Sequence, residues 1–251
     1  MAGSRRSKRK PAGLHASIAG AIPERVPTRW VKFFVGLFLL PAAGILTQTF
    51  FTAFARATVH DAFWITEEFW FFFLGADLWL VTFFCLPRPL WIYVFGHELT
   101  HALWVYLMGG RVHRFQVTKS GGHILTDKTN TWIALAPYFF PIYSLLVILA
   151  YGCAGIFTDV APYSRWLYGG IGFTWAFHLS FTFWMIPKGQ PDLAYGGTFF
   201  SLVLIYLLNL SLLAVLLIIA APGVSWRGFG CELLANASGF SCLLIRLVAK
   251  L

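Results

Sequence analysis

The chain has 251 residues, of which 58% are hydrophobic and only 12% are charged, and its formal net charge is +9. A soluble domain is typically about 45–50% apolar and about 25% charged, so this composition excludes an ordinary soluble enzyme or binding domain. Long apolar runs recur along the chain and predict an all-α polytopic protein that crosses a cell membrane several times.

The N-terminal segment, residues 1–29, is basic and aperiodic and contains Pro and Gly, which predicts a disordered tail. Because this charge directly precedes an apolar run, it favours contact with the anionic lipid of the bilayer over binding to nucleic acid. The basic residues that precede or open that run are Arg5, Arg6, Lys8, Arg9, Lys10, Arg25, Arg29 and Lys32.

The apolar runs predict about six transmembrane helices within a membrane domain that covers residues 30–221. Thr66, followed by Glu67 and Glu68, is typical of a capped helix start near the second of them. Residues 222–251 mix cationic and apolar positions and are expected to form an interfacial C-terminal tail. The six predicted spans are residues 30–54, 63–86, 89–107, 131–151, 166–186 and 198–221.

A polar insertion separates the third and fourth predicted spans. Residues 111–125 are rich in β-branched and aromatic side chains and contain the turn-like sequence Ser120-Gly121-Gly122. This pattern predicts a β-hairpin associated with the membrane. Pro137 and Pro141 are expected to kink the fourth span that follows it.

The third predicted span contains the sequence His97-Glu98-Leu99-Thr100-His101. On a helix, His97 and His101 share one face, so they can provide two corners of a tetrahedral Zn²⁺ site. Glu98 then lies beside the open position of the ion, where it can accept a proton from water. The alternative is that the three side chains only form hydrogen bonds to neighbouring helices. Because these groups are costly to place in lipid, each would then need its own hydrogen-bond partner.

A third ligand must come from elsewhere in the chain. Asp192 is favoured because it lies in a polar interruption between two predicted spans, and irregular backbone at membrane depth is tolerated where it is buried or lines a cavity. Asp192 could instead be a surface turn residue after Pro191. His178, inside the fifth predicted span, is the second choice, as a ligand or as a residue that supports the site. The remaining candidates are His60, Asp61, Asp77, His113 and His123.

Three segments together resemble the site-2 protease family of intramembrane zinc metalloproteases. The sequence from His97 to Val112 resembles the family's H-E-x-x-H helix and its Gly/Arg/Val exit into a β-hairpin. Residues 134–141 fall where the family has a Pro-containing middle helix. Residues 186–197 fall where it has a Pro-rich turn and an L-D-G-G motif, although Asp192 is followed here by Leu193. The resemblance covers residues 89–205, the expected catalytic core.

The resemblance implies a function and roles for the site residues. His97, His101 and Asp192 would bind Zn²⁺, and Glu98 would be the general base and acid of peptide hydrolysis. The substrate would be a transmembrane protein that unwinds locally, and the predicted hairpin could bind the unwound segment by strand addition.

Two other functions remain open, a membrane protein that binds or transports metal ions, and a catalytically inactive scaffold of the same fold. Transport predicts further paired acidic residues, for which Asp77 and the pair Glu67-Glu68 are the candidates.

The topology is also open. The basic N-terminus predicts a cytoplasmic start, yet simple alternation of six spans would place the basic hairpin loop outside. Either an early segment does not cross fully or the N-terminus is outside.

Overall fold

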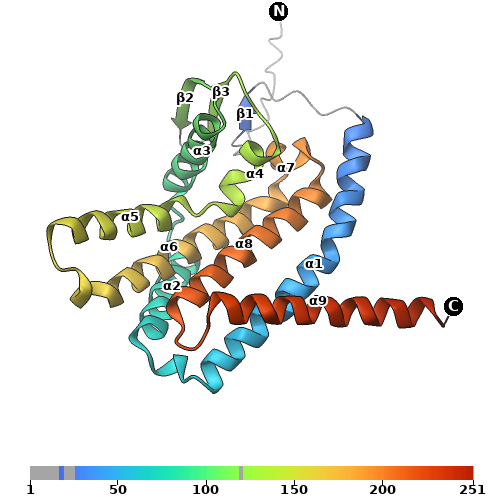
Figure 1. The fold of residues 1–251 in the computed structure, drawn as a ribbon. Coiled ribbons are helices and arrows are strands. Elements are labelled where there is room, and N and C mark those ends of the chain that lie inside the picture. Colours follow the sequence, from blue (N-terminus) through green and yellow to red (C-terminus); the bar gives the residue numbers. More distant parts are fainter. Residues whose placement is uncertain (1–16, 20–25, 119–120, 251) are drawn as a thin grey trace, which may run out of the picture.

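Helices make up most of the structure, and a small sheet lies at one end of it (Figure 1). The computed structural model describes residues 17–19, 26–118 and 121–250. In chain order the elements are β1 (Ser17–Ala19), α1 (Val26–Val59), η1 (Phe63–Ile65), α2 (Glu67–Cys85), α3 (Leu90–Leu107), β2 (Val112–Thr118), β3 (Gly121–Thr126), α4 (Thr131–Phe139), α5 (Ile142–Phe157), η2 (Ala161–Tyr163), α6 (Ser164–Met185), η3 (Ile186–Lys188), α7 (Pro191–Tyr195), α8 (Thr198–Ala220) and α9 (Trp226–Val248).

Four helices of the described chain, α1, α2, α8 and α9, are long and apolar enough to cross a membrane. The number rises to five if α4 and α5 together form one span. These helices agree with a helical membrane protein. The predicted number of about six is not reached by these criteria, because the helices expected around residues 89–107 and 166–186 form as α3 and α6 but are not among those that qualify.

The two ends of the chain were predicted to be a disordered tail and an interfacial tail, and both remain predictions. Most of the predicted tail over residues 1–29, including Arg5, Arg6, Lys8, Arg9, Lys10 and Arg25, lies outside the described residues. Its described parts are strand β1 and the first residues of α1. At the other end, residues 226–248 form the long helix α9, which is attached to α1 by a hydrogen bond from Asn236 Nδ2 to Thr49 Oγ1 (2.9 Å) and by an ion pair between Arg56 and Glu232 (3.2 Å).

Helix α2 begins as its sequence predicts. The Thr66 hydroxyl accepts the backbone N–H of Phe69 (3.3 Å), and Glu67 and Glu68 occupy the first turn, where carboxylates interact favourably with the helix dipole. Further along, α2 packs closely against α6 through Gly75 and Gly172. A methyl group at either position would overlap a backbone carbonyl of the opposite helix, so glycine permits this close approach.

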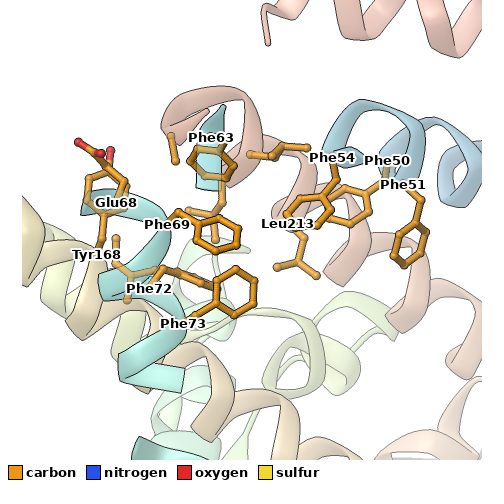
Figure 2. A pocket seen from close by; sticks show the side chains of 14 residues that line it. Phe50, Phe51, Phe54, Phe63, Glu68, Phe69, Phe72, Phe73, Tyr168 and Leu213 are labelled. Atoms are coloured by element: carbon orange, nitrogen blue, oxygen red, sulfur yellow. The ribbon is translucent and has the colours of Figure 1, made fainter. Parts of the chain in front are cut away.

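An apolar groove lies among α1, η1, α2, α6 and α8 (Figure 2). Its volume is about 290 Å³. Phenylalanine rings dominate the view of the groove, whereas the carboxylate of Glu68 lies at its edge and points away from them. The groove therefore offers an apolar surface at the start of α2, and its lining includes none of the residues predicted for the zinc site.

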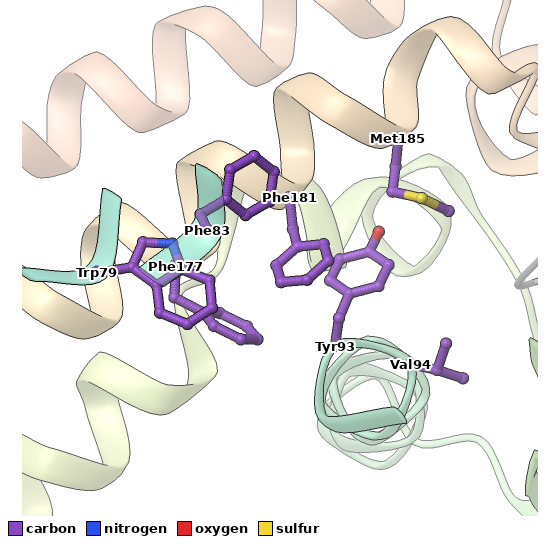
Figure 3. Close-up of a cluster of buried hydrophobic side chains, with 7 residues drawn as sticks. All are labelled: Trp79, Phe83, Tyr93, Val94, Phe177, Phe181 and Met185. Atoms are coloured by element: carbon purple, nitrogen blue, oxygen red, sulfur yellow. The ribbon is translucent and has the colours of Figure 1, made fainter. Parts of the chain in front are cut away.

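A buried aromatic cluster joins α2, α3 and α6 (Figure 3). Phe181 is fully buried in it, and the Tyr93 ring stacks on the Phe181 ring at 4.6 Å between centroids and 14° between planes. The cluster fixes α3 against α6 on the side that carries Tyr93. Its buried members are Trp79, Phe83, Tyr93, Val94, Phe177, Phe181 and Met185.

The sheet has the strand order β1-β3-β2. Strands β2 and β3 pair antiparallel, with Phe115 opposite Ile124, over the range predicted to form a hairpin. Gly121 and Gly122 lie within β3 rather than in the predicted turn. The parallel pairing of β1 with residues 123–125 of β3 was not predicted, because the two segments are about a hundred residues apart in the sequence. Association of the sheet with a membrane stays a prediction.

The segment predicted as a fourth span is broken rather than merely kinked. Helix α4 ends at Phe139, and α5 begins at Ile142 in a direction that differs by 71°. Pro141 lies at the break and has no N–H to continue the backbone ladder, whereas Pro137 lies within α4. The break turns the end of α4 toward α7 and α8, and this directs α4 side chains to the site described next.

Candidate metal centre

Helix α3 places His97 and His101 one turn apart on the same buried face. Their side chains are shielded from solvent, and their Nε2 atoms lie 3.2 Å apart. Cap residue Met108 and the positive φ of Gly109 (74°) mark the end of α3 just after this turn. The predicted helical spacing of the two histidines is therefore present in the structure.

The short helix α7 brings Asp192 to the two histidines. Pro191 occupies its first position, which suits a residue without a backbone N–H, and Asp192 follows it, buried to 3% exposure. Asp192 Oδ2 lies 3.3 Å from His97 Nε2 and 3.5 Å from His101 Nε2. The structure thus places Asp192 beside the histidines, as expected, and not on the surface as a turn residue.

The three side chains form a group that could hold a metal ion. Their facing atoms are separated by 3.2, 3.3 and 3.5 Å. An ion with four tetrahedral ligands at about 2.0–2.1 Å has neighbouring ligand atoms about 3.3 Å apart, so the triangle has the size that such an ion requires. Two imidazole nitrogens and one carboxylate oxygen are also a donor set that transition-metal ions accept.

Each member of this group has a further hydrogen-bond partner outside the group. The Nδ1–H of His101 donates to the carbonyl of Ile133 (2.8 Å), which leaves Nε2 as the lone-pair nitrogen of the neutral ring. The Tyr93 hydroxyl lies 3.2 Å from His97 Nδ1, and the Tyr138 hydroxyl donates to Asp192 Oδ2 (3.2 Å). These contacts orient all three donors toward one point.

Glu98 is fully buried, and neither of its carboxylate oxygens has a hydrogen-bond partner among the described residues. Buried polar atoms without a partner are rare, and each calls for an explanation. Gly122 of β3 lies directly against this side chain, because a Cβ placed there would be 2.6 Å from Glu98 Cγ. A carboxylate held without partners beside a potential metal site is available to accept a proton.

His178 does not join the metal-binding group. It lies beside a small cavity that His97 also lines, but its Nε2 atom faces Asn209 Oδ1 at 3.3 Å. The structure therefore gives this second-choice ligand a different partner. The other candidates also lie elsewhere: His123 is half-buried in the sheet, and the exposed ones are His60, Asp61, Asp77 and His113.

Several residues of the site were not predicted. Tyr93 could have been found, because it precedes His97 by four residues and so lies on the same helix face. Tyr138, Asn209 and Gly122 gave no such signal, since each reaches the site from an element that is distant in the sequence.

Comparisons of the chain with protein-family models, with curated proteins and with solved structures found no match.

Proposed function

We propose that this protein is an intramembrane zinc metalloendopeptidase that cleaves transmembrane protein substrates, as its resemblance to the site-2 protease family implies. The observation that carries the proposal is the buried triangle of His97, His101 and Asp192 with the unpaired carboxylate of Glu98 beside it. Helix α8, which is suited to crossing a membrane, packs against α7 and α4 beside this group, so the reaction would take place at membrane depth.

The residues present fit zinc, and each has a distinct task. His97, His101 and Asp192 would hold the ion, which when bound supplies an activated water and polarises the scissile carbonyl. Glu98 takes the proton of the attacking water and delivers it to the leaving nitrogen. The apolar surroundings of α3 limit access of bulk water and strengthen these electrostatic interactions.

The sheet would hold the substrate. A transmembrane helix hides its carbonyls in hydrogen bonds, so the segment to be cut must first unwind. Strand β3 passes over Glu98 at Gly122, which places its backbone next to the proposed reaction centre. An unwound segment that pairs with the sheet would lie in extended form beside Glu98, and extended strands bind by backbone hydrogen bonds.

The first test is the metal itself. The full chain, purified in detergent, is expected to contain about one zinc ion per molecule and to cleave a synthetic transmembrane peptide with Gly and Pro in its membrane segment. A chelator should remove both metal and activity, and added zinc should restore both. Wild-type protein that binds no zinc would exclude the metal site. Zinc binding without cleavage would instead favour a metal-binding or inactive protein.

Replacement of Gly122 by Val tests the position of the sheet. A valine side chain has no room between β3 and α3, because a Cβ at this position would already be 2.6 Å from Glu98 Cγ and 2.8 Å from Val94 Cγ1. Glu98 would have to move, and a displacement of about 1 Å at a reaction centre can cost on the order of 10²-fold in rate. We expect this loss in the cleavage assay, with zinc content unchanged.

The matched control is Gly152→Val on α5, where a Cβ would meet no atom within 4 Å. This variant should cleave at the wild-type rate. Equal rates for Gly122→Val and the wild type would contradict the placement of β3 over the reaction centre.

A further inference from the structure

Tyr138 is a buried residue of the site to which the reaction assigns no task. Its side chain is fully buried on α4, and its hydroxyl donates a hydrogen bond to Asp192 Oδ2 (3.2 Å). Its ring meets the His97 ring edge-on, with 5.3 Å between centroids and 87° between planes. Tyr138 therefore contacts two of the three proposed ligands, one through its hydroxyl and one through its ring.

Asp192 depends on such a contact more than the histidines do. His97 and His101 are carried by α3, which has 18 residues, whereas α7 has only five. A helix of one turn has little stability of its own, so tertiary contacts must fix its position. The carboxylate can also rotate, and a hydrogen bond from a buried phenol selects one orientation of its oxygens.

The backbone at Tyr138 is itself held by a second polar contact. In an unbroken helix its carbonyl would accept the N–H of Ile142, but that N–H donates to Phe140 across the break (2.9 Å). Asn209 Nδ2 donates to the Tyr138 carbonyl instead (2.9 Å), and His178 Nε2 lies 3.3 Å from the Asn209 Oδ1 atom. The chain His178, Asn209, Tyr138 thus connects α6 and α8 with the end of α4.

We propose that Tyr138 is a positioning residue that sets the carboxylate of Asp192 for metal binding, and that Asn209, supported by His178, holds Tyr138 in place. This inference rests on the metal site of the proposed function. It also assigns a role to two polar side chains, Asn209 and His178. Burial of polar groups among apolar helices costs free energy, so such residues often serve a function.

The test is Tyr138→Phe in the full chain, which removes one hydroxyl and keeps the ring against His97. Zinc affinity, measured by competition with a chromophoric chelator, should fall roughly 10- to 100-fold, as is typical when the outer partner of a ligand is lost. With cobalt in place of zinc, the visible absorption bands should also shift, because they report the coordination of the ion. The control Tyr151→Phe removes a hydroxyl on α5 that donates to the carbonyl of Val160, and should change neither quantity.

A double-mutant cycle tests the second step. Asn209→Leu alone should weaken zinc binding by less than Tyr138→Phe does. Combined with Tyr138→Phe it should add no further loss, because its effect on Asp192 passes through the missing hydroxyl. Wild-type affinity and spectrum in Tyr138→Phe would overturn the inference while leaving the metal site intact. Additive losses would overturn the role of Asn209, and a wild-type protein without metal would overturn the proposed function itself.

Discussion

Glu98→Gln is expected to abolish cleavage while leaving the metal bound. The amide has the size of the carboxylate but cannot accept the proton of the attacking water, and general base catalysis by a positioned side chain contributes about 10²- to 10⁴-fold to a rate. Because Glu98 has no hydrogen-bond partner among the described residues, its replacement removes no contact that supports the fold. The measurement is the cleavage rate of the synthetic transmembrane peptide together with zinc content per chain.

The control for this variant is Glu232→Gln on α9. That glutamate forms an ion pair with Arg56 and has no hydrogen bond or ion pair with the proposed metal ligands. The Glu232→Gln variant should therefore cleave at the wild-type rate. Unchanged cleavage in Glu98→Gln would refute the protease mechanism. Loss of zinc from it would show that Glu98 supports the ion instead of moving a proton.

Asp192→Ala is expected to lose both zinc and cleavage. Only His97 and His101 would remain as ligands. Two protein ligands bind zinc more weakly than the three that catalytic zinc sites use. We expect zinc content to fall from about one ion per chain to near zero after dialysis, and activity to fall to the level of the buffer. Metal analysis of the purified variant, with circular dichroism to confirm that it remains helical, provides the measurement.

Two matched variants serve as controls for Asp192→Ala. Asp77→Ala removes an exposed carboxylate of α2 and should keep both metal and activity. His178→Gln, assayed at saturating zinc, should keep its metal, since His178 contacts Asn209 and is not part of the ligand group. A variant of Asp192 that retains zinc while the His178 variant loses it would show that the ligand set contains His178 instead.

The sequence was sufficient for the parts of the fold that local patterns determine. Long apolar runs predicted α2, α6 and α8 to within a few residues, the Thr66 cap marked the start of α2, and the spacing of His97 and His101 predicted their common face. Asp192 was predictable for a different reason. Few acidic residues occur in the chain, and this one lies in a polar interruption flanked by apolar runs, where burial requires a partner.

What could not be predicted depends on contacts between distant segments. The 71° turn after α4 requires more than Pro141, because a proline can bend a helix by various amounts and the packing of α4 decides the result. In the sequence, nothing distinguishes Tyr138 from the other aromatic residues of its apolar run. Only the three-dimensional arrangement brings its hydroxyl to Asp192. Helix α9 covers the residues predicted to form an interfacial tail and is also long and apolar enough to span, so its place at the membrane stays a prediction.

The third strand of the sheet has a consequence for how any peptide can reach the reaction centre. Strand β3 already pairs with β2 on one edge and with β1 on the other, at residues 123–125. A peptide that pairs with β3 on the β1 side must therefore compete with a segment of the same chain. An intramolecular competitor acts at an effective concentration that can reach the millimolar range, so peptides at micromolar concentration would displace β1 only if they bind β3 far more tightly.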